Sequence, residues 1–110
     1  MLLVCRFAVP AAEVDAFRAR AERALELLTA ADGALGGELG RAVDDPLRWV
    51  LTVRFASVHA YRRALSPFPV REHVVPLLSE ALADEPSTYE TLLDAADGVT
   101  RQHPSLLSDR

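Results

Sequence analysis

The sequence contains no lysine and only one cysteine among its 110 residues. A single cysteine excludes a disulfide framework and a multi-cysteine metal site within the chain. The formal net charge of −4, without a basic patch, argues against nucleic acid as a partner. No apolar run approaches the roughly 20 residues that a membrane-spanning helix needs, and residues 1–10 are too short an apolar stretch for a signal peptide. These absences predict a cytoplasmic protein that binds neither nucleic acid nor membrane.

What the sequence does contain is typical of one soluble globular domain. Hydrophobic residues make up 50% of the chain and charged residues 25%. We assign the domain to residues 1–95, where the pattern of apolar residues is regular. Residues 96–110 are expected to form a C-terminal tail that is flexible or packed on a partner, because little pattern remains there.

The most informative stretch covers residues 48–82. Its first eight residues alternate between two faces, which predicts a β-strand over residues 48–55 with one strongly apolar face. Ser57 then offers an N-cap for a short helix. Pro67 and Pro69 interrupt that helix, and a second helical run begins at Pro69, with apolar residues repeating every four positions.

The remaining elements follow from the same periodicities. We expect strands at residues 2–9, 37–43 and 87–95 and a helix at residues 11–29. The glycine-rich residues 30–37 have neither GxGxxG nor Walker spacing and are interpreted as a turn. The order strand, helix, strand, strand, helix, strand predicts an α+β fold, the ferredoxin-like split βαβ plait, with a four-stranded antiparallel sheet and its helices on one face.

The sheet face turned away from the helices is predicted to need a cover. Its expected residues are Leu2, Val4, Arg6, Ala8, Val50, Thr52 and Arg54. This mixture is too apolar to leave in water and too polar for a sealed core. We therefore predict a homodimer through this face, in which Arg6 and Arg54 pair with carboxylates. The candidate carboxylates are Glu38 and Glu90.

Four segments carry a resemblance to a known family: LLVCRFAVP, AFRARAERALELL, DDPLRWVLTVRFASVHAYRRAL and REHVVPLLSEAL. Their layout, and the strand–helix junction around WVLTVRF, is similar to that of the antibiotic biosynthesis monooxygenase (ABM) family over residues 1–95. The resemblance implies a dimeric α+β barrel, in which two ferredoxin-like sheets pack face to face, and a pocket in each subunit between the sheet and its helices. The family includes cofactor-independent oxygenases of quinols and anthrone-type polyketides, as well as haem-degrading enzymes.

The haem-degrading branch of the family implies three functional positions. Its axial histidine matches His73, whereas its asparagine on the first strand matches Cys5 and its pocket tryptophan matches Arg63. Because two of the three positions differ, we expect no cofactor, and haem binding through His73 is the alternative. We also expect no metal, since His59 and His103 have no companions at metal-ligand spacing.

His73 is the candidate catalytic residue. An imidazole with an unperturbed pKa of about 6.5 accepts a proton at neutral pH. Removal of a phenolic or quinol proton leaves an electron-rich anion that reduces oxygen directly, so the protein supplies a base, an orientation and a dry site. The alternative is a structural histidine that bonds to a neighbouring carboxylate such as Glu72 or Glu80.

The expected substrate-binding residues are Cys5, Trp49, Phe55, Tyr61 and Phe68. The four aromatic side chains are interpreted as a cage for a flat ligand, and the alternative is that they belong to the core. Cys5 is interpreted as a small buried hydrophobe of the pocket wall, because no basic residue is placed to lower its pKa.

Together these features favour a small cofactor-independent monooxygenase that oxidises an aromatic, quinol or polyketide-type substrate between the sheet and its helices. The second hypothesis is a non-catalytic dimeric protein that binds a small hydrophobic molecule or haem. The third is a dimerising module that acts through a protein partner, suggested only by the leucines of the tail.

Overall fold

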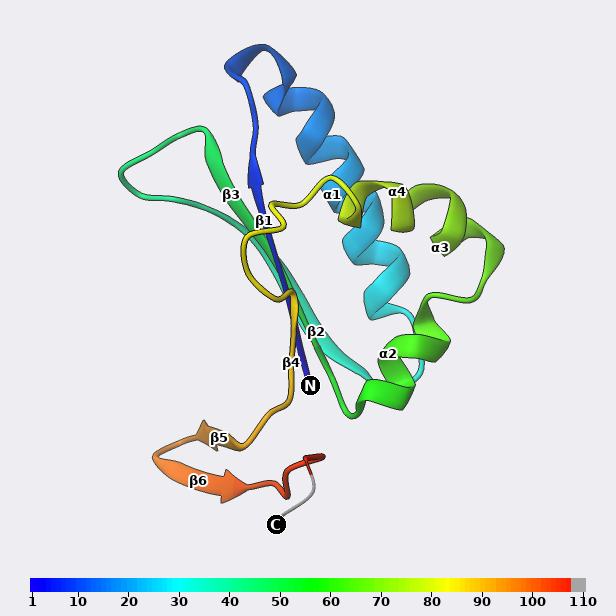
Figure 1. The fold of residues 1–110 in the computed structure, drawn as a ribbon, viewed down its shortest axis with the longest axis vertical. Coiled ribbons are helices and arrows are strands. Elements are labelled where there is room, and N and C mark those ends of the chain that lie inside the picture. Colours follow the sequence, from blue (N-terminus) through cyan, green and yellow to red (C-terminus); the bar gives the residue numbers. More distant parts are fainter. Residues whose placement is uncertain (108–110) are drawn as a thin grey trace.

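The computed structural model describes residues 1–107 and has an α+β fold (Figure 1). In chain order the elements are β1 (Leu2–Ala8), the 3₁₀ helix η1 (Ala11–Glu13), α1 (Val14–Thr29), β2 (Ala34–Arg41), β3 (Arg48–Phe55), α2 (Val58–Ala64), α3 (Phe68–His73), α4 (Val75–Leu78), β4 (Thr88–Tyr89), β5 (Leu93–Ala96) and β6 (Val99–Gln102). The helices all lie on one side of the sheet (Figure 1).

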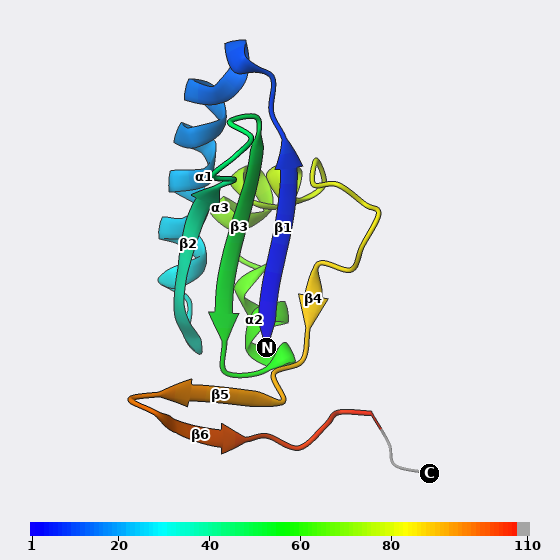
Figure 2. The same cartoon turned by 90° about the vertical axis from the view of Figure 1, so that its left-hand side faces the viewer.

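The main sheet has four antiparallel strands in the order β2-β3-β1-β4 (Figure 2). This is the strand order of the ferredoxin-like plait, so the predicted fold is confirmed for the single chain. Strands β5 and β6 form a separate two-stranded sheet below the main one (Figure 2). The central strand β3 has the predicted bounds, whereas β2 begins three residues earlier than expected.

The broken helical region is divided more finely than the sequence suggests. The Ser57 hydroxyl accepts a hydrogen bond from the Ala60 N–H at 3.0 Å, which confirms the predicted N-cap of α2. The run predicted from Pro69 is two short helices, α3 and α4, that meet at Val74. Pro76 explains the interruption, because its ring nitrogen has no proton to donate to the carbonyl of Glu72.

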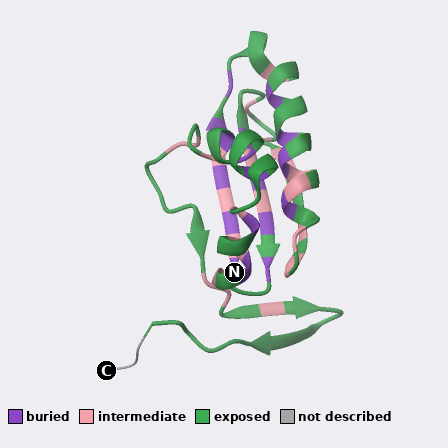
Figure 3. Cartoon of the chain, turned by 90° about the vertical axis from the view of Figure 1, so that its right-hand side faces the viewer, coloured by how far each residue is buried: buried purple, intermediate pink, exposed green. Residues whose placement is uncertain are grey.

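The core lies between the helices and one face of the sheet. Figure 3 shows the buried residues gathered where α1 and the shorter helices cover the strands. Leu51, Val53 and Phe55 on β3 are at most 1% exposed. Phe17 on α1 joins two strands, because its ring packs 5.0 Å from Phe7 on β1 and 5.7 Å from Trp49 on β3. The apolar face predicted for residues 48–55 is therefore the helix-covered face.

We call the other side of the sheet the open face. Figure 2 shows its strands uncovered by the described part of the chain. On this face Arg6 donates to Asp84 at 2.9 Å and lies 3.5 Å from Glu85. Its partners are thus residues of the same chain other than Glu38 and Glu90. Glu90 instead accepts hydrogen bonds within the C-terminal segment.

The C-terminal region has more regular structure than its sequence pattern suggested. The strand expected over residues 87–95 is two short strands, β4 and β5, that belong to different sheets. Strand β6 follows a tight turn at Asp97 and Gly98, both of which have positive φ angles. The hairpin β5–β6 therefore spans the boundary predicted between the domain and its tail, and residues 108–110 of that tail lie outside the described residues.

Candidate functional site

A hollow of about 440 Å³ lies at one end of the sheet. Its lining residues are Arg6, Phe7, Gly40, Arg41, Ala42, Arg48, Trp49, Val50 and Leu82. Val50 is the direct cross-strand neighbour of both Arg6 and Gly40, which places these three positions side by side on the open face. The volume is in the range of small-molecule sites in proteins. We refer to it below as the open-face hollow.

Three local features of the sequence create this hollow. Gly40 leaves its floor open, because a Cβ there would lie 3.4 Å from Cγ1 of Val50. The connection between β2 and β3, residues 42–47, bends toward the open side (Figure 1). The third wall comes from the segment after α4, which is attached to β1 by the hydrogen bond from the Leu82 N–H to the Arg6 carbonyl at 2.8 Å.

Two of the three arginines that line the hollow, Arg6 and Arg48, differ in how firmly they are held. Arg6 is bound by the two carboxylates of Asp84 and Glu85, and 35% of its side chain is exposed. Arg48 has only a 3.8 Å approach to Asp45, and 55% of its side chain is exposed. The Arg48 guanidinium is therefore the better placed cation for an anionic group of a ligand.

Trp49 is the one predicted site residue that lines the hollow. Its side chain is only 6% exposed, and Arg41 stacks over the ring at 5.3 Å from the centroid. The indole Nε1 is buried and finds no hydrogen-bond partner within residues 1–107. A buried indole N–H normally has a partner, so this position is polar and unsatisfied.

Three other predicted residues gather on the helix-covered side. Phe55 and Tyr61 meet edge to face at 5.4 Å, and Cys5 is buried nearby on β1. Burial, and to a smaller extent Cys5, raises the pKa of the Tyr61 hydroxyl. Burial raises the pKa of the Cys5 thiol to about 11. Both groups therefore keep their protons at neutral pH, which agrees with the interpretation of Cys5 as a small hydrophobe.

The remaining predicted residues lie on the outer surface of α3. His73 is half-exposed, and its Nε2 atom lies 3.0 Å from Oε1 of Glu72. Phe68 is 64% exposed. His73 thus has the neighbour that the structural interpretation proposed, while its role in a reaction stays a prediction. The six predicted residues form three groups: Trp49 at the hollow, three residues in the core layer, and two on the helical surface.

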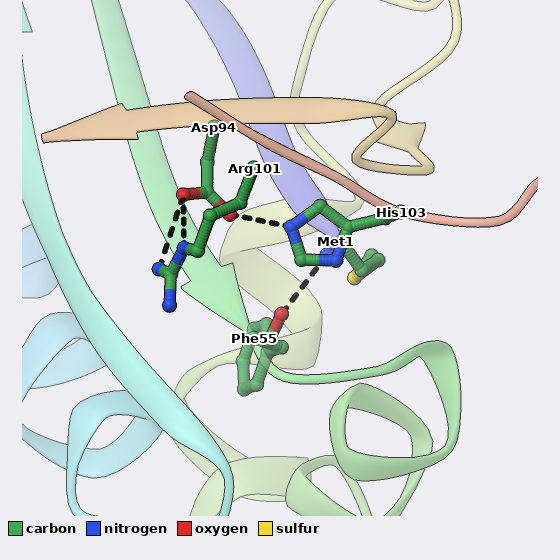
Figure 4. Close-up of polar contacts among 5 residues, drawn as sticks. All are labelled: Met1, Phe55, Asp94, Arg101 and His103. Carbon is green, nitrogen blue, oxygen red and sulfur yellow. Dashed lines mark hydrogen bonds and ion pairs between the residues drawn. The ribbon is translucent and has the colours of Figure 1, made fainter. Parts of the chain in front are cut away.

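A further polar cluster lies on the C-terminal hairpin (Figure 4). Asp94 accepts a hydrogen bond from Nε of Arg101 at 3.1 Å and also bonds to Nε2 of His103. The hydrogen bond from His103, followed by the contribution of Arg101, lowers the pKa of the Asp94 carboxyl. The Asp97–Gly98 dipeptide, which favours two-residue hairpin turns, was the available sequence signal for this element.

Neither a metal-binding cluster nor a membrane-spanning helix is present among the described residues. Within residues 1–107 no three His, Cys, Asp or Glu side chains gather closely enough to hold a metal ion. None of the helices in that range is long and apolar enough to cross a membrane.

Comparison with known proteins places the chain in a family. The sequence model described as Antibiotic biosynthesis monooxygenase matches residues 1–67. No curated protein matches the sequence.

Several solved structures share the fold. SnoaB, a cofactor-independent oxygenase from Streptomyces nogalater, has 24% identity and a TM-score of 0.61, with 73% of this chain and 80% of that chain covered. Rv0793 from Mycobacterium tuberculosis has 20% identity and a TM-score of 0.62, covering 76% and 84% of the two chains. A conserved protein from Methanosarcina mazei Go1 has 18% identity and a TM-score of 0.64, covering 76% and 82%.

Proposed function

Because the chain belongs to the antibiotic biosynthesis monooxygenase family, we propose that it is a cofactor-independent monooxygenase of a small aromatic, quinol or polyketide-type substrate. The observation that carries the proposal is the open-face hollow, which combines apolar walls with the weakly held guanidinium of Arg48. The similarity of the chain to SnoaB, which is itself a cofactor-independent oxygenase, supports the same reaction class.

The chemistry requires a substrate that supplies its own electrons. Loss of a proton from an acidic ring CH₂ or a quinol O–H gives an anion, which the positive charge of Arg48 stabilises. The anion passes electrons to O₂ and forms a carbon–oxygen bond. In an anthrone-type substrate the CH₂ group becomes C=O with one oxygen atom, and the other oxygen leaves as water. No separate reductant is consumed, because the CH₂ group provides all four electrons that reduce O₂.

The apolar part of the hollow has its own task in this reaction. Ala42, Val50 and Leu82 offer apolar surface on which a flat ring packs, and they exclude water from one side of it. Exclusion of water strengthens the attraction between Arg48 and the substrate anion, since the local dielectric constant falls. The unsatisfied N–H of Trp49 is a donor that a polar substrate group can reach only if the ring shifts, because it is buried.

The candidate base, His73, does not line the open-face hollow. His73 lies on α3 on the helix-covered side, so the sheet separates it from the open-face hollow (Figure 1). If His73 is the base, the substrate binds on the helix side of the sheet and not in the hollow, and His73→Ala is then expected to abolish turnover while the protein stays folded. Full activity in that variant would contradict the role of His73 as base and leave ionisation of the substrate to the field of Arg48.

The decisive experiment fills the hollow. Gly40→Val adds a side chain toward Val50 without a severe clash, since the Cβ contact is 3.4 Å. We expect it to abolish oxygen uptake with menadiol or dithranol, measured above the rate without protein. The matched control is Glu38→Val, which lies on the same strand and the same face but does not line the hollow. Equal rates in the two variants would contradict the proposed site.

A second function is favoured by one observation. Cys5 and Tyr61, the candidate-site groups with shifted pKa values, both shift away from neutrality. If His73 is not a base, these two groups leave the site without one near neutral pH, which suits a protein that binds a small hydrophobic molecule or haem without converting it. Saturable binding of menadione with no oxygen uptake would support this function. A Soret shift on titration with haem, lost in His73→Ala, would identify haem as the ligand.

We further propose that the chain acts as a homodimer through the open face. Val4 and Val50 leave apolar surface half-buried in the single chain, next to the exposed Arg54. A second sheet packed there would cover that surface, as the predicted α+β barrel requires.

A further inference from the structure

The short helices α3 and α4 lie in one segment, residues 67–81, which we call the helical flap. Figure 3 shows the short helices in front of the strands and to one side of α1. Because α1 packs mainly on β2 and β3, the flap and α2 cover the β1 side of the sheet. The buried residues of the flap are Val70, Val74 and Leu77, each at most 3% exposed.

The chain is fixed on both sides of the flap and interrupted within it. Before the flap, Ser57 caps α2 with a hydrogen bond of 3.0 Å, and after it the Leu82 N–H donates to the Arg6 carbonyl at 2.8 Å. Inside the flap, α3 has six residues and α4 has four, and Pro76 lacks the N–H that would continue the helix through Val74. Helices this short depend on packing for their stability, so the flap is suited to separate from the core as a unit.

An ion pair joins the flap to α1. Arg20 donates two hydrogen bonds to Glu80, at 3.0 and 2.7 Å. Within residues 1–107 no other ion pair connects the flap to the rest of the chain. Both side chains are about half exposed, and an exposed pair of this kind contributes little free energy. The Arg20–Glu80 pair is therefore readily broken and formed again, as a latch requires.

Three of the residues expected to contact a substrate lie beneath α2 and the flap. Cys5 faces the helices from the middle of β1 and is 2% exposed, and Phe55 meets Tyr61 at 5.4 Å. The open-face hollow and a groove between α1 and β2 both lie away from these three residues. Val74 and Leu77 of the flap pack in the same core cluster. The space expected for a ligand between sheet and helices is thus occupied by the flap itself.

We propose that the helical flap is the gate of a ligand site on the helix side of the sheet, and that the Arg20–Glu80 pair is its latch. The proposal rests on the helix-side form of the function proposed above, because His73 lies on the flap. A flat ring enters over β1 when the pair opens, and it takes the space that Val74 and Leu77 leave. Within residues 1–107 no charged side chain is buried, so this space accepts an uncharged, largely apolar ring.

The first test uses Cys5, the only thiol of the chain, as a reporter of opening. Its labelling by dithiobis(nitrobenzoic acid) in native buffer requires exposure, because the thiol is buried. We expect Glu80→Gln to speed labelling about two- to fivefold, the factor that loss of an exposed ion pair gives. The matched control is Glu26→Gln, which loses a pair within α1 and should leave the rate unchanged. Equal rates in the parent chain and Glu80→Gln overturn the gate.

Complete unfolding also exposes Cys5, so a second variant separates the two routes. Leu25 packs over Gly37, where an added Cβ would lie 3.1 Å from Leu25 Cδ2, and it therefore joins α1 to β2 away from the flap. Leu25→Ala is expected to destabilise the protein in urea but to leave Cys5 labelling in water within about twofold of the parent rate. Labelling that rises by the same factor as the unfolded fraction shows exposure by global unfolding alone and overturns the proposal.

The third test asks whether the gate serves a ligand. Naphthol at about ten times its dissociation constant is expected to slow Cys5 labelling about tenfold, because a ring bound under the flap holds it closed over the thiol. Failure of naphthol to bind, or binding that leaves labelling unslowed, overturns the flap as the gate of a ligand site. Slower labelling, without oxygen uptake by the parent chain on menadiol or dithranol, supports the gate and contradicts the proposed reaction alone.

Discussion

The two faces of the main sheet, compared along β3, use neighbouring residues for different purposes. Leu51 is fully buried under the helices, whereas Val50, the preceding residue, stays partly exposed on the open face. The helix-covered face is closed by α1 and the short helices, and its aromatic residues pack on one another. The open face has glycines at two positions of β2, exposed arginines and a hollow.

The difference separates stability from function. Apolar area removed from water on the helix-covered side supplies most of the free energy of folding. The open face contributes little to that in the single chain, because much of its surface remains in water. A sheet face that stays partly exposed in this way is suited to be covered by a ligand and by a second copy of the chain.

The largest expected effect comes from truncating two adjacent residues of β3 whose side chains lie on opposite faces of the sheet. Leu51→Ala leaves a cavity in the core and is expected to lower the free energy of unfolding by about 2–5 kcal/mol. Val50→Ala should lower it by less than about 1 kcal/mol in the monomer. Urea unfolding at several protein concentrations checks this, since only the Val50 effect is expected to grow with concentration. Equal effects would contradict the division between the two faces.

A charge on the open face is expected to act on association alone. Val4 is half-buried between β3 and β4 on that face. Val4→Asp should weaken the dimer at least about tenfold, or about 1.4 kcal/mol, because it desolvates a carboxylate at the interface. The far-ultraviolet circular dichroism is expected to stay unchanged. Sedimentation equilibrium measures the dimer, and an unaltered dissociation constant would place the interface elsewhere.

The fold could be predicted because its signals are local and periodic. The alternation at residues 48–55 and the Ser57 cap fix a strand and a helix start by themselves. Strand β6 was missed, because an isolated hairpin has no buried face to impose alternation, and only the Asp97–Gly98 turn marked it. The division at Val74 follows from Pro76, yet the sequence alone did not show where the second helix would resume.

The site could be predicted only in part, because it depends on which face each strand presents to a hollow. Trp49 was selected as an aromatic residue of a strand and does line the hollow. Gly40 was not, although its missing side chain opens the floor, because a glycine in a weak strand gives no sign of what lies opposite. Arg48 received no role either, since its loose contact with Asp45 is a property of the folded loop.

A smaller effect tests how the helix layer is attached. The Ser57 hydroxyl caps α2, which covers the part of the sheet near Phe55. Ser57→Ala leaves the Ala60 N–H without this acceptor and is expected to cost about 1 kcal/mol of unfolding free energy. Ser57→Asp keeps an acceptor and should restore most of the loss. Both values come from urea unfolding, and a silent Ser57→Ala would show that α2 contributes nothing to the covered face.

The smallest expected effect concerns the ion pair at the edge of the covered face. Arg20 on α1 donates two hydrogen bonds, at 3.0 and 2.7 Å, to Glu80 just after α4. These bonds lower the pKa of the Glu80 carboxyl, while the Arg20 pKa is raised. Both side chains are about half exposed, so Glu80→Gln is expected to cost less than about 1 kcal/mol at neutral pH.

The sign of the pH dependence follows from the lowered pKa of Glu80. The folded state binds this proton less readily than the unfolded state, so the stabilisation is present above the unfolded pKa of about 4.3 and is lost as the pH falls through the folded pKa. The difference between the parent chain and Glu80→Gln should therefore vanish in acid. Glu26→Gln is the matched control, because its partner Arg23 lies within the same helix and joins no two elements. A difference that persists at low pH would show that Glu80 acts through packing, and that the covered face owes nothing to charge.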